Sequence, residues 1–112
     1  MSDDDDDALL FVYGTLRRAA GDPAHALLAA VGSFVGDATV RGRVIAHGGY
    51  PALVDGDEVV AGELWCVRDG WDALDAYETL HDAVPQYTRE RCAVLQGDRR
   101  RTAWVYRARL RP

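Results

Sequence analysis

Glu78 is the acidic residue whose place in the sequence most favours chemistry, because it falls on the apolar side of a predicted helix over residues 69–78. At roughly 100° per residue, Glu78 lies between Trp71 and Leu74 on that side. Burial and the negative end of the helix dipole both raise the pKa of a carboxyl group, which suits it to proton transfer near neutral pH. The alternative is that the helix frays after Ala76 and that Glu78 is hydrated at the surface.

A second candidate is the turn formed by Tyr13, Gly14, Thr15 and Leu16, which follows the apolar run 8–13. Glycine allows successive main-chain N–H groups to converge on one point, and the threonine adds a hydroxyl group. Such a turn binds a carboxylate or a phosphate. A glycine that merely ends a strand gives the same pattern, so the residues alone leave both interpretations open.

The remaining polar candidates fit structural roles better. Glu63 is the rival carboxylate, but it lies in the middle of a predicted strand and is expected to pair with an arginine of a neighbouring strand. Glu78 and His81 have the E-x-x-H spacing of di-iron proteins, yet the second copy that those sites need is missing, so no metal is predicted. His25 and His47 have no partner at ligand spacing. The chain contains no lysine, which excludes Schiff-base and P-loop chemistry.

Length and charge limit the class of protein further. The chain has 112 residues, enough for a single domain over 8–112 after a disordered acidic leader over 1–7. Without the five leader aspartates, the formal charge of −5 becomes zero, so neither nucleic acid nor a membrane is an expected partner. The acidic N-terminus differs from targeting segments, and we expect a cytoplasmic protein. There, Cys66 and Cys92 are expected to be buried free thiols.

The elements that must position these residues follow from the hydrophobic pattern. We predict strands over 8–13, 38–46, 59–67 and 87–95, and a last strand through Leu110. Helices are predicted from Asp22 to about Ala30 and over 69–78, with a loop over 47–51 and a turn over 97–101. Because the later strands follow one another through short connections, antiparallel pairing is favoured. The prediction is an α+β fold, with a small, mixed, mostly antiparallel, barrel-like sheet and two short helices.

The sequence resembles the γ-glutamylcyclotransferase superfamily, which includes γ-glutamylamine cyclotransferases and the plant avirulence-induced proteins. The matching segments, in the family's order, are Phe11 to Arg18, Gly48 to Val54, Val60 to Trp65, Leu74 to Glu78 and Tyr87 to Arg89. The resemblance implies a small mixed α/β barrel-like domain. It also implies a substrate-binding turn at Tyr13 to Leu16, a proton-transferring acid at Glu78, and Tyr87 as a residue that lines the same pocket.

The chemistry implied by the resemblance needs no cofactor. The α-amino group of a γ-glutamyl amide attacks its own γ-carbonyl, and 5-oxoproline and a free amine are released. The segment 79–86 varies among such proteins, which leaves the leaving-amine side of the pocket undetermined. A non-catalytic module that binds a small carboxylate on the same fold is the main alternative, and a purely structural interaction domain is a third. The sequence leaves both a monomer and a homodimer open.

Overall fold

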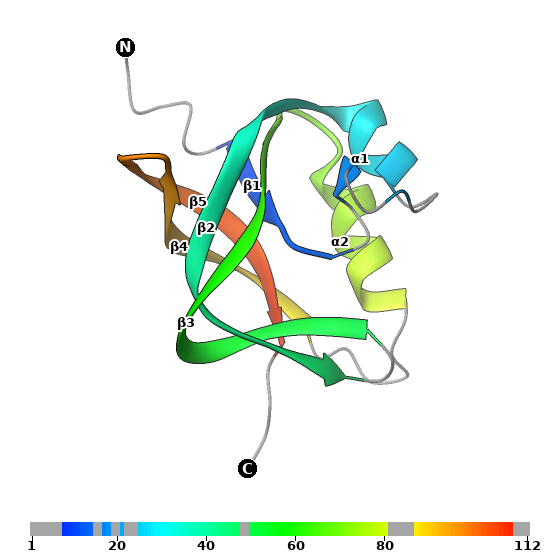
Figure 1. The fold of residues 1–112 in the computed structure, drawn as a ribbon. Coiled ribbons are helices and arrows are strands. Elements are labelled where there is room, and N and C mark those ends of the chain that lie inside the picture. The colour runs from blue at the N-terminus through cyan, green and yellow to red at the C-terminus, as the bar shows by residue number, and fades with distance from the viewer. Residues whose placement is uncertain are drawn as a thin grey trace.

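The described part of the chain has the element order β1, α1, β2, β3, α2, β4, β5 (Figure 1). The computed structural model describes residues 8–14, 17–18, 21, 25–47, 50–80 and 87–108, and only the main chain of 46–47, 50–51, 76–80, 87–88 and 108. The strands are β1 (Leu9–Val12), β2 (Gly32–His47), β3 (Tyr50–Val67), β4 (Tyr87–Gln96) and β5 (Arg99–Ala108). The helices are α1 (His25–Val31) and α2 (Trp71–Leu80).

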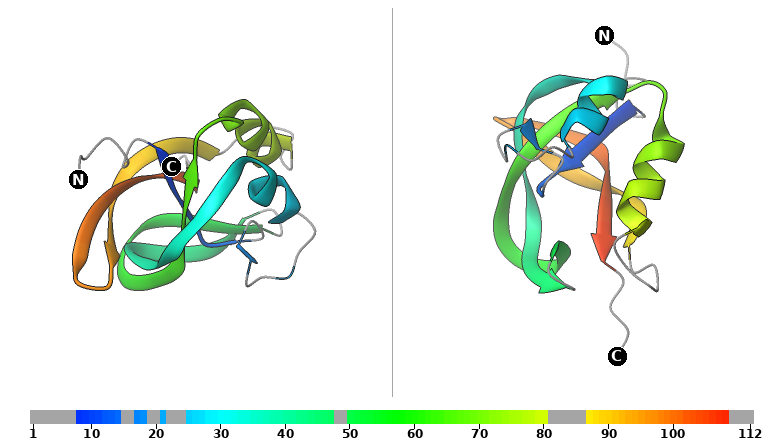
Figure 2. Two further views of the ribbon diagram at one scale, coloured as in Figure 1. Left: turned by 90° about the horizontal axis from the view of Figure 1, so that it is seen from above. Right: turned by 90° about the vertical axis from the view of Figure 1, so that its right-hand side faces the viewer.

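The strands form a closed barrel in the order β1-β3-β2-β4-β5. Most neighbouring strands are antiparallel. Strand β5 closes the barrel, because it pairs in parallel with β1 and, through Arg107, with Leu53 of β3. Figure 2 shows this closure from above and from the side, with β1 crossing the middle of the molecule. The predicted α+β fold with a mixed, mostly antiparallel, barrel-like sheet is therefore confirmed.

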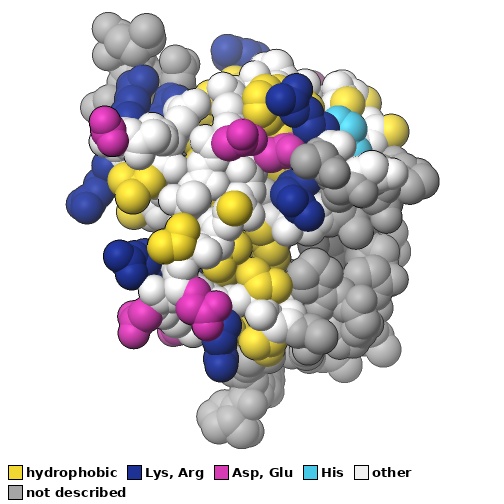
Figure 3. Space-filling model, viewed as in Figure 1, with side chains coloured by type: hydrophobic (Ala, Val, Ile, Leu, Met, Phe, Trp, Pro, Cys, Tyr) yellow, Lys and Arg dark blue, Asp and Glu magenta, His cyan; other side chains and the backbone are white. Residues whose placement is uncertain are grey.

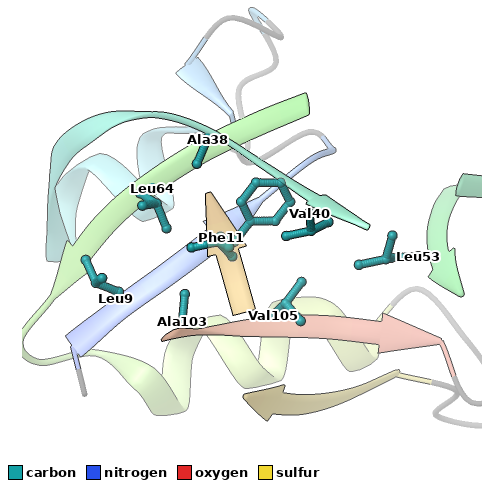
Figure 4. Close-up of a cluster of buried hydrophobic side chains, with 9 residues drawn as sticks. Leu9, Phe11, Ala38, Val40, Leu53, Leu64, Ala103 and Val105 are labelled. Carbon is teal, nitrogen blue, oxygen red and sulfur yellow. The ribbon is translucent and has the colours of Figure 1, made fainter. Parts of the chain in front are cut away.

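Strand β1 is buried on both of its faces, which explains why its sequence is apolar without interruption. Leu9 and Phe11 point into the barrel and pack with residues of all the other strands (Figure 4). Leu10 and Val12 point the opposite way, as alternation along a strand requires, and belong to a second buried cluster that includes helix residues. The strand before the candidate turn is consequently among the most tightly packed parts of the molecule.

Both helices lie on the same side of the barrel, the right-hand side in Figure 1. Leu28 of α1 and Leu74 of α2 are fully buried there. The helices approach closely next to Gly70, where a Cβ atom would lie 2.5 Å from Cγ1 of Val31 and where φ is +105°. Only glycine combines that backbone conformation with that lack of space. The main chain of α2 is helical through Leu80, so the fraying considered after Ala76 does not occur.

Several predicted boundaries were wrong. Strand β2 begins at Gly32 and not at residue 38, and β3 begins at Tyr50 and not at residue 59. The expected loop over 47–51 is shorter, because His47 pairs with Tyr50 and β3 begins there. The expected turn over 97–101 is also shorter, because β5 begins at Arg99. Pro51 is paired with Ala46 of β2, and Arg99 to Arg101 are paired with β4, so strand pairing includes proline and charged residues that resemble a loop in the sequence.

The surface shows no dominant charge on the face drawn in Figure 3. Acidic and basic side chains are interspersed there around a central group of apolar ones. None of the helices within the described ranges is long and apolar enough to cross a membrane. These observations concern only the residues that the structure describes.

A candidate site between a turn and a helix

The end of β1 and the middle of α2 pack against the same group of side chains. Val12, the last residue of β1, and Leu74 of α2 belong to one buried cluster. The predicted turn begins at the residue after Val12, and position 78 lies one helical turn after Leu74. The fold thus brings the two predicted parts of the site to the same side of the barrel.

The side chain of Tyr13 fixes the start of the turn. Its ring packs against the barrel interior, and its hydroxyl group accepts a hydrogen bond of 2.9 Å from the main-chain N–H of Leu53. The same hydroxyl donates one of 2.7 Å to the main-chain carbonyl of Tyr106. One side chain therefore connects the end of β1 to both β3 and β5, and these two hydrogen bonds of its hydroxyl are structural.

Glu63 fixes the far end of the same segment. Its side chain is only 3% exposed, and Oε1 accepts hydrogen bonds from the main-chain N–H of Arg18 at 2.9 Å and from Nε1 of Trp65 at 3.1 Å. We expected Glu63 to pair with an arginine of a neighbouring strand, whereas the arginine contact seen here is with the main-chain N–H of Arg18, which lies outside the strands. Between the two ends, the N–H of Arg17 donates to the carbonyl of Gly14 at 3.1 Å, which closes a tight turn.

The helix side of the site is held by an ion pair among aromatic rings. Arg89 of β4 donates from Nε and Nη2 to the two carboxylate oxygens of Asp75 in α2, at 3.0 and 3.2 Å. Its guanidinium group lies over the rings of Trp71 and Trp104, with centroid distances of 4.5 and 4.8 Å. The hydroxyl of Tyr106 donates to Asp75 at 2.6 Å. We call these five residues the Asp75 cluster.

Tyr106 connects the two sides. Its carbonyl accepts the hydrogen bond from Tyr13, and its own hydroxyl donates to Asp75. Hydrogen bonds therefore link Leu53, Tyr13, Tyr106, Asp75 and Arg89 in series, and the covalent structure of Tyr106 connects its main-chain bond to its side-chain bond. Sequence analysis missed this series, although Asp75 and Arg89 each stand in a segment that matches the superfamily. The signal was present in those two segments, but nothing in the sequence shows that they meet.

A groove of about 510 Å³ opens next to the turn, and Arg17, Asp37 and Glu63 contribute to its lining. Asp37 of β2 and Glu63 of β3 are partners in the antiparallel register. Among the described residues, no three histidine, cysteine, aspartate or glutamate side chains are grouped in a way that would hold a metal ion. The lining of the groove combines these charged residues with apolar ones, namely Ala38, Ala61 and Leu95.

The individual predicted residues are placed as follows. Tyr13 and Gly14 follow β1 directly, while Thr15 and Leu16 lie outside the described residues. Glu78 belongs to the last turns of α2 and Tyr87 is the first residue of β4, each with a main chain that is described and a side chain that is not. Their roles in a site stay predictions.

The other residues that were weighed lie elsewhere. The ring of His25 stands edge-on to Trp65 with centroids 5.1 Å apart, which is a packing role. His81 lies outside the described residues, as does the side chain of His47. Both cysteines are free thiols, and they are half-buried where full burial was expected.

Comparisons with known proteins agree on one family. A family model described as "Gamma-glutamyl cyclotransferase, AIG2-like" matches residues 10–111. A Vibrio cholerae protein named "Putative gamma-glutamylcyclotransferase" is 32% identical over 100 residues, which are 88% of this chain and 79% of that protein. The crystal structure of an AIG2-like mouse protein superimposes with a TM-score of 0.73 at 25% identity, covering 90% of this chain and 76% of the mouse chain. YkqA from Bacillus subtilis gives 0.72 at 27% identity over 90% of this chain, which spans only 35% of YkqA.

Proposed function

The chain belongs to the gamma-glutamyl cyclotransferase, AIG2-like family. From this premise, we propose that it is an enzyme that releases 5-oxoproline and a free amine from a small γ-glutamyl amide. The observation that carries the proposal is the chain of hydrogen bonds through Tyr106, which joins the turn after β1 to the helix that bears Glu78.

In this reaction the nucleophile is already part of the substrate. The α-amino nitrogen bonds to the γ-carbonyl carbon, and the amide C–N bond breaks. The α-ammonium group loses two protons as it becomes the lactam N–H, and both end on the departing amine, which leaves as an ammonium ion. Atoms and charge balance without water or an enzyme nucleophile. Because the attacking group is tethered, the enzyme contributes mainly by holding the substrate in a folded-back conformation.

Glu78 acts as the general base and then as the general acid. It removes a proton from the α-ammonium group and later delivers one to the leaving nitrogen. The support for this role is that α2 remains helical through Leu80, two residues past Glu78, and that Leu74 and Asp75 fix the preceding turn of the helix on the barrel.

The turn binds the amino-acid end of the substrate. The main-chain N–H groups of Gly14, Thr15 and Leu16 hold its α-carboxylate and the negative charge that develops on the γ-carbonyl oxygen. Tyr13 orients this turn through its two hydrogen bonds. Tyr87, whose main chain begins β4, is proposed to line the same pocket.

The test is an assay of purified protein with a panel of γ-glutamyl dipeptides and γ-glutamyl amines, with 5-oxoproline measured by mass spectrometry. We expect turnover with at least one substrate. Glu78→Gln should keep the fold and the ligand affinity and lower turnover by at least about 10²-fold. Glu58→Gln is the matched control, because Glu58 is exposed on β3.

The outcomes separate the alternatives. Full activity in folded Glu78→Gln would remove Glu78 from the mechanism. Binding of γ-glutamyl compounds without any 5-oxoproline would favour the non-catalytic module that binds a small carboxylate.

A further inference from the structure

We propose that the Asp75 cluster is the device that positions Glu78, so that Asp75, Arg89 and Tyr106 are positioning residues for proton transfer. This inference rests on the proposed function and deepens it. It concerns residues that act on turnover through the orientation of α2, without contact with the substrate.

The geometry places the cluster between the two halves of the site. Asp75 lies three residues before Glu78 on α2, and Arg89 lies two residues after Tyr87 on β4. A bidentate arginine–carboxylate pair fixes direction as well as distance, because two parallel hydrogen bonds define a plane. The pair therefore sets the rotation of the last turns of α2 relative to the start of β4.

Two aromatic rings restrict the arginine itself. Its guanidinium group lies over Trp71, from the first turn of α2, and over Trp104, from β5. The planar group stacks on both rings and still presents its edge to Asp75, which the ammonium group of a lysine cannot do. The hydroxyl of Tyr106 donates a third hydrogen bond to Asp75, and the carbonyl of Tyr106 accepts one from Tyr13.

Stability alone is a poor explanation for this arrangement. The side chains of Arg89 and Asp75 are 27% and 39% exposed, so water weakens the attraction between their charges, although the bidentate geometry makes this pair stronger than an ordinary surface ion pair. The buried apolar residue Leu74 already attaches the helix to the barrel. What the cluster adds is orientation, and a displacement of about 1 Å in a reacting group costs up to about 10²-fold in rate.

The experiment compares Tyr106→Phe, Arg89→Lys and Arg89→Gln with the wild type, using the γ-glutamyl substrate that the wild type turns over best. Tyr106→Phe removes one hydroxyl group and leaves the carbonyl bond to Tyr13 in place. We expect kcat to fall by about 10-fold or more in Tyr106→Phe and in Arg89→Gln, while KM stays within about twofold. Arg89→Lys keeps the charge and should recover part of the lost kcat.

The control is Asp55→Asn, which removes the ion pair between Arg107 and a fully exposed Asp55. It should leave kcat and KM unchanged. All rates are measured well below the midpoint of thermal unfolding and are normalised to the folded fraction from circular dichroism, so that loss of folded protein does not count as loss of positioning.

The possible results are distinct. If the wild type is active, Glu78→Gln is inactive and folded Tyr106→Phe and Arg89→Gln keep the wild-type kcat, the positioning role is rejected and the proposed function stands. If the wild type releases no 5-oxoproline from any member of the panel, both are rejected. If kcat falls in proportion to the folded fraction alone, the cluster is structural and the inference fails.

Discussion

The turn side and the helix side of the candidate site are held in opposite ways. On the turn side, Glu63 is almost completely buried and accepts hydrogen bonds from two neutral N–H groups, while Tyr13 is bonded to main-chain groups of two strands. On the helix side, the pair of Asp75 and Arg89 is partly exposed and consists of charges that water also solvates.

This difference predicts whether a substitution will mainly lower stability or mainly lower turnover. A buried donor that loses its acceptor keeps the full cost of desolvation, so substitutions on the turn side should lower stability. Breaking a partly exposed ion pair lowers the free energy of unfolding less, because water can solvate each charge that has lost its partner. Substitutions on the helix side should therefore change turnover more than they change unfolding.

The largest expected effect on stability is that of Glu63→Ala. The substitution leaves the buried indole N–H of Trp65 and the partly buried main-chain N–H of Arg18 without the acceptor that they share. We expect the free energy of unfolding to fall by about 2–4 kcal/mol, measured by urea denaturation. The main chain at Arg18 would also lose its hydrogen bond to β3, so the turn should be less well fixed and activity should fall as well.

Glu63→Gln is the matched control for that substitution. The amide oxygen of glutamine can accept both hydrogen bonds, so the loss should be much smaller than for alanine. If Glu63→Gln keeps its stability but loses as much turnover as Glu78→Gln, then Glu63 is the proton-transferring residue and our assignment is wrong. Equal stability of Glu63→Ala and the wild type would contradict the contrast between the two sides.

The sequence predicted the elements well where the hydrophobic pattern was strong. The run 8–13 indicated a strand buried on both sides, and Leu9–Val12 is such a strand. The prediction from the sequence failed over residues 50–58, where Asp55, Gly56 and Asp57 resemble a loop. In the structure β3 continues through them, and the register moves from Gly42 opposite Glu58 to Arg43 opposite Val54, so the turn-like residues mark an irregularity within a hairpin.

The site was predictable only in part for a different reason. Local patterns pointed to the turn after β1 and to Glu78, because each stands at the end of a regular element. The pair of Asp75 and Arg89 depends on which of 13 arginines meets which of 18 acidic residues, and the closure of the barrel decides that. The double role of Tyr106 is equally invisible, since its carbonyl and its hydroxyl act on opposite sides of the site.

Tyr13→Phe should have a smaller effect than Glu63→Ala. It removes the acceptor of the Leu53 N–H and the donor to the carbonyl of Tyr106. We expect a loss of about 1–2 kcal/mol by the same urea method, because the ring still packs and only the hydroxyl is missing. Tyr106→Phe should lose less, since Asp75 keeps Arg89 as a partner. The reverse order would break the contrast between a buried turn side and a partly exposed helix side.

The smallest effect concerns the thiol of Cys92, which packs against the barrel interior from β4, three residues after Arg89. Burial raises its pKa above the ordinary value of 9.0, the Arg107 guanidinium lowers that pKa in part, and the Glu90 carboxylate adds to the increase. Less thiolate is therefore present at pH 7.5, and alkylation by iodoacetamide should be slower than for a cysteine in an unfolded peptide. Because this pKa is higher in the folded state, the thiol reduces stability only as the pH rises above about 9.

The alkylation rate of Cys92 also shows how far a change on the helix side spreads. The modified peptide is quantified by mass spectrometry between pH 7 and 10, in the wild type and in Arg89→Gln. If loss of the ion pair only loosens α2, the two proteins should react at the same rate, because Cys92 depends on the barrel interior and not on the helix. A faster reaction in Arg89→Gln would mean that β4 itself separates from the barrel. The helix side would then be as structural as the turn side, and a fall in kcat in that variant would no longer report on orientation.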